Sequence, residues 1–253
     1  MQSVSLDLIA FLFLIAIFAG GVDAIAGGGG LLTLPSLLLV GLPPIEALGT
    51  SKFQSLFGTG SASFRFWQKG FLSLKKIWAL GLLCFVTSIL GVICATNIPT
   101  HYLNYAIPVI LILIALYFLF HKDLASNKTP TIPHAPLYLA LLIPFIGFYD
   151  GIFGPGAGTF YTMGFVLLGG LSLLNATANV KFCNFTSNVG GFLAFALFAT
   201  IHWQIGLVMA AGQFIGARIG ASLAIRNGTR LIRPLVVIIT LMMAAKIIIE
   251  AST

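Results

Sequence analysis

Long apolar stretches without a single charged residue run through this chain and restrict it to one kind of fold. Residues 8–22, 77–95 and 102–120 are the clearest of them. At 1.5 Å per residue, a helix of ~20 apolar residues spans the ~30 Å hydrocarbon core of a bilayer. Charged residues make up only 8% of the 253 positions, too few to cover the surface of a soluble domain. The sequence therefore predicts an all-α polytopic membrane protein and excludes a soluble enzyme, a nucleic-acid binder, a disordered chain and an outer-membrane barrel.

The second half of the chain repeats the first. The first half contains VDAIAGGGGLLTLPSLLLVGL and the second contains YDGIFGPGAGTFYTMGFVLLGGL. Asp150 follows Asp23 by 127 positions, and Lys181 follows Lys52 by 129, because two residues are inserted between these points. A duplicated membrane domain is typical of transporters built from two structural repeats. We predict a first transmembrane repeat over residues 1–120, a cytoplasmic linker over 121–136 and a second repeat over 137–253.

The loop charges indicate how the two repeats are oriented. If residues 137–170 cross the membrane once, the nine Lys and Arg residues of the loops divide six to three between its two sides. If that segment enters and returns, all nine lie inside, as the positive-inside rule favours. We therefore expect two inverted repeats, each with a Gly-broken re-entrant or half-helix hairpin plus three long helices. The nine residues are Arg65, Lys69, Lys75, Lys76, Lys122, Lys128, Arg226, Arg230 and Arg233.

Glycine-rich breaks interrupt an apolar segment in each half. A broken helix leaves backbone N–H groups unpaired, which a membrane tolerates only where the backbone is buried in protein or lines a watery cavity. The short helix predicted over 31–40 is about 15 Å long, so its positive N-terminal end should lie near the midplane, where it favours an anion. Close packing of helices is the alternative role for the glycines. The predicted backbone ligands are Gly27, Gly28, Gly29, Gly30, Gly154, Gly156 and Gly158.

Charged side chains stand beside each break. Asp23 and Asp150 fit two roles: they carry a coupling proton, or they accept the orphan N–H groups of the broken backbone. Lys52 and Lys181 also fit two roles: they neutralise an anion in a central cavity, or they extend to the membrane interface. The recurrence of both lysines favours the cavity. The polar residues predicted to bind substrate beside them are Thr50, Gln54 and Asn184.

The remaining motifs give no sign of catalysis or of a cofactor. The four His residues lack the spacing of metal ligands, and the three cysteines lie in apolar stretches without a CxxC pair, so we predict no metal and no cofactor. No nucleophile–base pair or metalloprotease motif occurs within the predicted spans, so the chain is not expected to be an enzyme. No nucleotide-binding motif points to an ATP-driven pump.

These motifs resemble those of the sulfite exporter TauE/SafE family, in particular its YfcA-like branch. The resemblance rests on the two glycine motifs, on ALGTSKFQ and ATANVKFCNFTSNVGG, and on GQFIGARIG, and it covers nearly the whole chain. It implies a multi-pass transporter of the bacterial inner membrane for sulfur-containing anions such as sulfite or sulfonates. One departure is that Cys183 stands where the first repeat has Gln54, so the two repeats offer different polar groups.

The function predicted from the sequence is secondary transport of a small anion, such as a sulfur oxyanion or organosulfonate. Access would alternate around a midplane site formed by the two helix N-termini and the two lysines. The expected partners are the anion, the lipid bilayer and a coupling proton; a homo-oligomer fits the sequence, and nucleic acid does not. A passive anion channel is the main alternative, and a non-transporting structural protein would not need the polar residues near the lysines.

Overall fold

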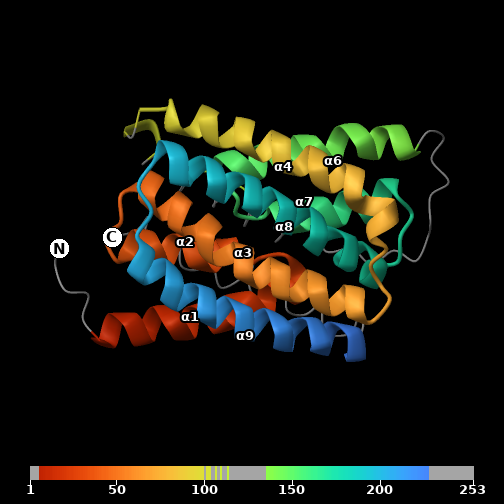
Figure 1. The fold of residues 1–253 in the computed structure, drawn as a ribbon, viewed down its shortest axis with the longest axis horizontal. Helices are drawn as coiled ribbons and strands as arrows, with labels where there is room; N and C mark the ends of the chain where they lie inside the picture. The colour runs from red at the N-terminus through yellow and green to blue at the C-terminus, as the bar shows by residue number, and fades with distance from the viewer. Residues whose placement is uncertain are drawn as a thin grey trace.

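Helices form all the regular structure in the part of the chain that the structure describes. The computed structural model describes residues 6–99, 101–103, 106, 109, 113 and 135–227, so most of the predicted 102–120 helix and 121–136 linker lies outside it. Within these residues no strand occurs. The elements are α1 (Leu6–Ala26), α2 (Gly30–Leu39), α3 (Pro44–Gln68), α4 (Leu74–Thr96), α6 (Ala135–Ile152), α7 (Ala157–Met163), the π-helical turn η1 (Gly164–Leu168), α8 (Leu173–Phe198) and α9 (Trp203–Asn227), as Figure 1 shows.

The first broken segment is a hairpin that returns to the end of the molecule from which it started. α1 runs from the left-hand end in Figure 1 toward the middle, and α2 runs back toward that end. Between them Gly27 has a φ of +81°, which glycine adopts without a Cβ clash. The ten residues of α2 span about 15 Å, as predicted for residues 31–40. The break therefore lies in the interior of the molecule.

The second broken segment starts from the opposite end. α6 runs inward from the right-hand end in Figure 1, and α7 with η1 returns toward it. Gly154 and Gly156 turn the chain here with φ of +88° and +79°. Gly154 corresponds to Gly27 in the sequence repeat, so the same left-handed turn occurs at the same place in both halves.

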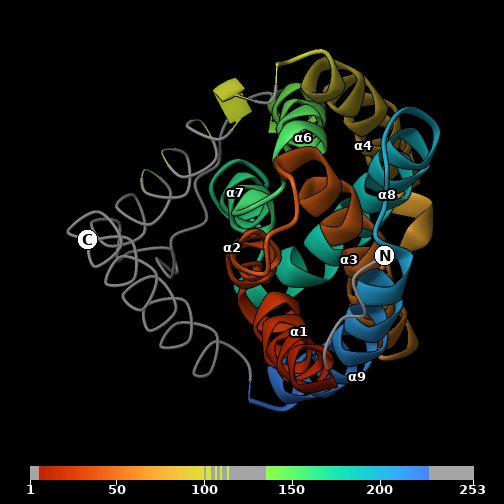
Figure 2. The ribbon, with the colours of Figure 1, turned by 90° about the vertical axis from the view of Figure 1, so that its left-hand side faces the viewer.

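Helices of one half pack mainly against helices of the other. α1 lies along α9 and α4 along α6, while α3 contacts both α8 and α9. Figure 2, which looks along the long axis, shows α2 and α7 next to each other, with α6 on one side of the two and α1 on the other. Glycines allow the close approach: a Cβ at Gly220 of α9 would collide with the backbone of Gly21 in α1, and one at Gly91 of α4 with the carbonyl of Phe148 in α6. Small residues of this kind are typical of helix contacts in membranes.

Apolar and polar side chains are separated in the way a membrane requires. Three described helices are long and apolar enough to cross a bilayer, namely α1, α4 and α9. α3 and α8 are just as long, with 25 and 26 residues, but they carry polar side chains that are buried. Large apolar side chains such as Phe18, Leu90 and Leu207 are exposed instead. A bilayer would accept this apolar exterior, and the polar side chains of α3 and α8 form an interior site.

Candidate functional site

The two breaks touch each other inside the molecule. A Cβ at Gly27 would lie 2.6 Å from the carbonyl carbon of Gly158, and one at Gly158 would lie 2.6 Å from the carbonyl oxygen of Gly27. Thr159 Oγ1, at the start of α7, donates a hydrogen bond to the carbonyl oxygen of Ala26 at 3.2 Å. Glycine at both positions is therefore a requirement of this contact, in which the backbone of one hairpin lies directly on that of the other.

Two ion pairs cross between the halves beside this contact. Lys52 Nζ of α3 lies 2.6 Å from Asp150 Oδ1 at the end of α6, and Lys181 Nζ of α8 lies 2.9 Å from Asp23 Oδ2 near the end of α1. All four side chains are nearly or fully buried, the most exposed being Asp23 at 11%. Each half thus supplies the cation of one pair and the carboxylate of the other. Both ammonium groups lie in the interior and neither extends to an interface.

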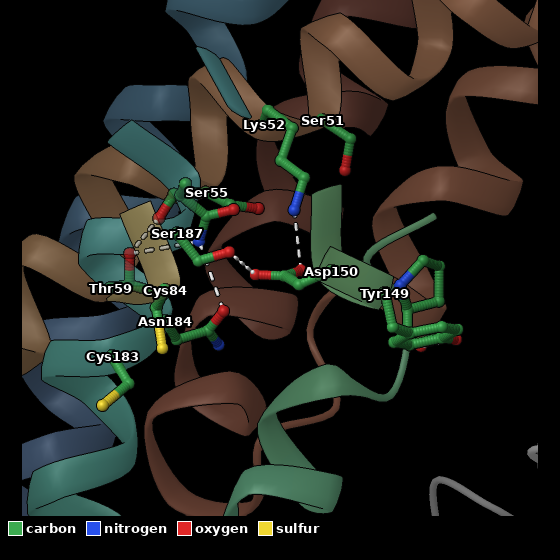
Figure 3. A network of polar contacts seen from close by, with 12 residues as sticks. Ser51, Lys52, Ser55, Thr59, Cys84, Tyr149, Asp150, Cys183, Asn184 and Ser187 are labelled. Carbon is green, nitrogen blue, oxygen red and sulfur yellow. Dashed lines mark hydrogen bonds and ion pairs between the residues drawn. The ribbon is translucent and has the colours of Figure 1, made fainter. Parts of the chain in front are cut away.

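The second oxygen of each carboxylate has a different donor. Asp23 Oδ1 accepts the backbone N–H of Gly29 at 3.2 Å, which is the capping role predicted as one of its two alternatives. Asp150 Oδ2 accepts a short hydrogen bond from Ser187 Oγ of α8 (Figure 3). Asp23 is therefore tied to the backbone of its own break, whereas Asp150 is held by two side chains from α3 and α8.

A cavity lined by both polar and apolar groups adjoins the Lys52–Asp150 pair. Hydroxyl and amide groups project into it from one side of α3 and one side of α8 (Figure 3). Asn188 Nδ2 donates to Thr59 Oγ1 at 3.4 Å and to Asn184 Oδ1 at 3.5 Å, so these two helices are linked across the cavity wall. The lining residues are Asp23, Gly27, Gly30, Leu48, Ser51, Lys52, Ser55, Thr59, Asp150, Phe153, Gly154, Pro155, Gly158, Asn184 and Asn188.

Packing positions the Lys52 side chain in this wall. A Cβ at Gly191 of α8 would lie 3.1 Å from Cδ of Lys52 and 3.3 Å from its Cε, so the alkyl chain of the lysine lies on the bare backbone of this glycine. The ammonium group is thereby directed at Asp150 and the cavity. Such groups, with hydroxyl and amide side chains around them, can donate hydrogen bonds to the oxygens of a small anion.

The structure brings together about half of the residues predicted as ligands. Gly27, Gly30, Lys52, Gly154, Gly158 and Asn184 line the cavity, together with Asp23 and Asp150, whereas Gly28, Gly29, Thr50, Gln54, Gly156 and Lys181 are outside its lining.

Two of the residues outside the lining have clear surroundings. Thr50 Oγ1 accepts the backbone N–H of His202 at 3.0 Å, at the start of α9. The amide of Gln54 is buried without a hydrogen-bond partner for either its nitrogen or its oxygen.

Several lining residues were absent from the predicted set. Ser51, Ser55 and Thr59 recur every four residues, which places them on one face of α3, and Asn188 follows Asn184 by one turn of α8. A search for polar residues at helical spacing would have selected them. The cysteines take no visible part in the site: Cys84 and Cys183 are buried, Cys94 is exposed, and no metal-binding cluster of His, Cys, Asp or Glu occurs in the described ranges.

The apolar exterior and the buried polar interior together define a multi-pass helical membrane protein. The chain belongs to the Sulfite exporter TauE/SafE family, whose model matches residues 12–247, and this confirms the resemblance found in the motifs. It is 42% identical to "Probable membrane transporter protein ORF9" of Sinorhizobium sp, over 99% of this chain and 96% of that protein. It is 40% identical to "Probable membrane transporter protein YfcA" of Escherichia coli K12, over 96% of this chain and 91% of that protein.

A more distant relative is a plant protein. "Sulfite exporter TauE/SafE family protein 6" of Arabidopsis thaliana is 28% identical over 39% of this chain and 22% of its own length. No solved structure matches the chain.

Proposed function

We propose that this protein is a secondary transporter of a small anion, a sulfur oxyanion or an organosulfonate, and that it works by alternating access around the cavity beside Lys52. The observation that carries the proposal is a polar cavity with a buried lysine, at the point where two broken helices meet. Unpaired backbone and charged side chains are tolerated inside a membrane protein mainly where they line a path for a polar solute. The hydroxyl and amide groups of α3 and α8 supply further donors for the oxygens of such a solute.

The substrate class is drawn from the family. Its model is described as a sulfite exporter, and the Arabidopsis relative carries the same words in its name. Sulfite and sulfonates present three oxygens that accept hydrogen bonds from several directions. The cavity lining offers donors of this kind from Ser51, Ser55 and Asn184, besides the ammonium group of Lys52.

Alternating access in this proposal depends on inverted repeats, and several contacts support them. The contact of α1 with α9 has its counterpart in the contact of α6 with α4, and that of α3 with α9 in that of α8 with α4. The hairpins start at opposite ends of the molecule. Each ion pair joins a lysine of one half to an aspartate of the other half. A rocking motion of one repeat against the other would then open the cavity to each side in turn.

The proposed orientation places the basic loops in the cytoplasm of a bacterium, with the protein in the inner membrane. The 69–73 loop, the start of α6 and the end of α9 lie at one end of the molecule in Figure 1. Arg65, Lys69, Lys75, Lys76 and Arg226 all lie near that end. By the positive-inside rule this end would face the cytoplasm.

Transport into liposomes tests the proposal directly. Purified protein should be reconstituted and offered sulfite, thiosulfate, sulfate, organosulfonates and carboxylates, with and without a pH gradient. A secondary transporter accumulates its substrate above the external concentration and shows counterflow, whereas a passive anion channel only equilibrates it. Protein with Gly27→Val provides the matched inactive control, because this side chain cannot fit between the breaks. Absence of uptake for every anion of the panel would overturn the proposal.

A further inference from the structure

The two ion pairs differ in their relation to the cavity. Both members of the Lys52–Asp150 pair line the cavity. Of the other pair only Asp23 lines it, because Lys181 is fully buried behind the cavity wall. Among the described charged residues that line the cavity, one is a cation and two are carboxylates. With Lys181 included, the two pairs together carry no net charge. An anion entering beside Lys52 therefore has to compete with the carboxylate of Asp150 for the same ammonium group. Binding becomes favourable if a carboxylate of the cavity wall is neutralised, because like charges repel strongly where the effective dielectric is low.

The surroundings of the two carboxylates decide which one can accept a proton. Neutralising Asp23 would leave Lys181 as a buried, unpaired cation, and an anion in the cavity could not reach it. It would also weaken the hydrogen bond from the N–H of Gly29. Neutralising Asp150 would also weaken the hydrogen bond from Ser187 and loosen the pair with Lys52, but the ammonium group of Lys52 stays in the cavity wall, where an entering anion can pair with it.

We propose that Asp150 accepts the coupling proton and that Lys52 then binds the substrate anion, whereas the Asp23–Lys181 pair has a structural role and connects the two halves. This inference rests on the proposed transport function. The proton adds to a carboxylate oxygen of Asp150, and Lys52 keeps its own proton and its charge. The anion then takes the place of the carboxylate beside Lys52 Nζ. One proton and one monovalent anion cross together, so the cycle moves no net charge. The two repeats thus divide their work, despite similar sequences.

Within the part of the chain that the structure describes, no other group near Asp150 competes for this role. Apart from Lys52 and the Asp23–Lys181 pair, the titratable side chains around it there are those of Tyr149 on its own helix and Tyr161 on α7, and Cys84 of α4 and Cys183 of α8 lie beside Tyr161. Tyrosine and cysteine side chains are ordinarily neutral near pH 7. Asp150 is therefore the carboxylate whose protonation changes the charge that an anion meets at Lys52.

The experiment compares net transport with exchange in proteoliposomes, using labelled sulfite and labelled methanesulfonate, which carries no titratable proton of its own. The wild type should accumulate label when the outside is more acidic, and an imposed membrane potential should have little effect. Asp150→Asn should keep counterflow exchange but lose accumulation driven by the pH gradient. Its net transport should instead respond to the membrane potential, because Lys52 is permanently unpaired and no proton accompanies the anion.

Asp23→Asn is the matched control, since it makes the same chemical change in the other pair. It should reduce exchange and accumulation in equal proportion, together with the melting temperature, and its transport should still respond to the pH gradient. The double variant Asp23→Asn/Lys181→Gln removes both charges of this ion pair. Its melting temperature should lie between that of Asp23→Asn and that of the wild type. Loss of the response to pH in Asp23→Asn, with exchange retained, would overturn the assignment.

A measurement on the wild type guards against an Asp150→Asn protein that fails to fold. Uptake of methanesulfonate on a solid-supported membrane should produce no sustained current. A steady current that reports uncompensated anion movement would contradict the coupling of one proton to one anion, and would leave the transport function itself intact. A wild type that neither transports nor binds any anion of the panel would overturn the proposed function, and this inference with it.

Discussion

Lys52 and Asp150 are 98 residues apart in the sequence, yet Nζ of the lysine lies 2.6 Å from Oδ1 of the aspartate in the interior of the molecule. Lys181 and Asp23, which are 158 residues apart, form a second ion pair, in which the second half supplies the lysine and the first half the aspartate. Neither half therefore completes an ion pair with its own residues. Any displacement of one half against the other at this level has to stretch or break both pairs, which links the charge state of the site to the relative position of the halves.

Breaking the Lys52–Asp150 pair from one side should be more harmful than removing it altogether. Lys52→Gln leaves a buried carboxylate without its cation, a change that typically costs ~3–5 kcal/mol. The double variant Lys52→Gln/Asp150→Asn leaves no buried charge at this pair and should unfold at a higher temperature than Lys52→Gln. Thermal unfolding in detergent of the wild type, both single variants and the double variant measures this coupling.

Transport by the same variants separates stability from binding. Both proteins that lack Lys52 should need at least about tenfold more substrate for half-saturation, which corresponds to ~1.4 kcal/mol of lost binding. Near-normal half-saturation in the double variant would show that Lys52 does not bind the anion. A double variant no more stable than Lys52→Gln would show that the pair is not coupled.

The contact between the two breaks should not tolerate one extra carbon. Gly27→Ala combines an unfavourable φ of +81° with a Cβ placed 2.6 Å from the carbonyl carbon of Gly158. Gly41→Ala is the matched control, because Gly41 has a φ of +87° but no atom within 4 Å of the added Cβ. Both variants bear a backbone cost of about 1–2 kcal/mol, and only the first must also displace the opposite hairpin.

We expect Gly41→Ala to transport at a rate close to that of the wild type after correction for protein amount. Gly27→Ala should lose most transport while still reaching the membrane. Initial rates in proteoliposomes, normalised to reconstituted protein, check this difference. Equal activity of the two variants would mean that the breaks can separate at no cost to function.

The glycine runs predicted where the two apolar segments break, while the prediction that each segment turns back depended on the distribution of the loop charges. The sequence also predicted the short helix after the first break to within one residue at each end. It could not predict that the ion pairs cross. Lys52 and Lys181 stand at equivalent places, as do Asp23 and Asp150, so pairing within a repeat and pairing between repeats agree equally well with the sequence.

The prediction of the ligand set had a similar limit. Thr50, Lys52 and Gln54 are close in the sequence, but residues two positions apart on a helix point about 200° apart, so Lys52 faces away from both Thr50 and Gln54. Lys52 lines the cavity, while Thr50 accepts a hydrogen bond at the start of α9 and Gln54 is buried elsewhere. Only the packing of α3 against its neighbours selects the face that becomes the site.

The buried amide of Gln54 predicts a stabilising substitution. Neither its nitrogen nor its oxygen has a hydrogen-bond partner, and such groups cost ~1–3 kcal/mol when buried unpaired. Gln54→Met keeps a similar volume and removes both polar atoms. We expect the melting temperature to rise by about 2–4 °C for each kcal/mol gained, as is usual for a chain of this size. A lower melting temperature than that of the wild type would show that the amide is satisfied in the membrane, for example by a buried water.

The orientation of the bundle can be tested with single cysteines in a background that lacks Cys84, Cys94 and Cys183. Gln68 at the end of α3 and Asn227 at the end of α9 are exposed, and they lie at the end that carries the basic loops. Thr200, between α8 and α9, is exposed at the opposite end. We expect Gln68→Cys and Asn227→Cys to resist a membrane-impermeant thiol reagent in intact cells and to react after permeabilisation, whereas Thr200→Cys should react in intact cells.

Each half contributes one of the two protected positions, so labelling of Asn227→Cys alone from outside would mean that the second repeat is not inverted relative to the first. Labelling of both Gln68→Cys and Asn227→Cys, with Thr200→Cys protected, would preserve the inverted repeats and reverse the orientation of the whole molecule.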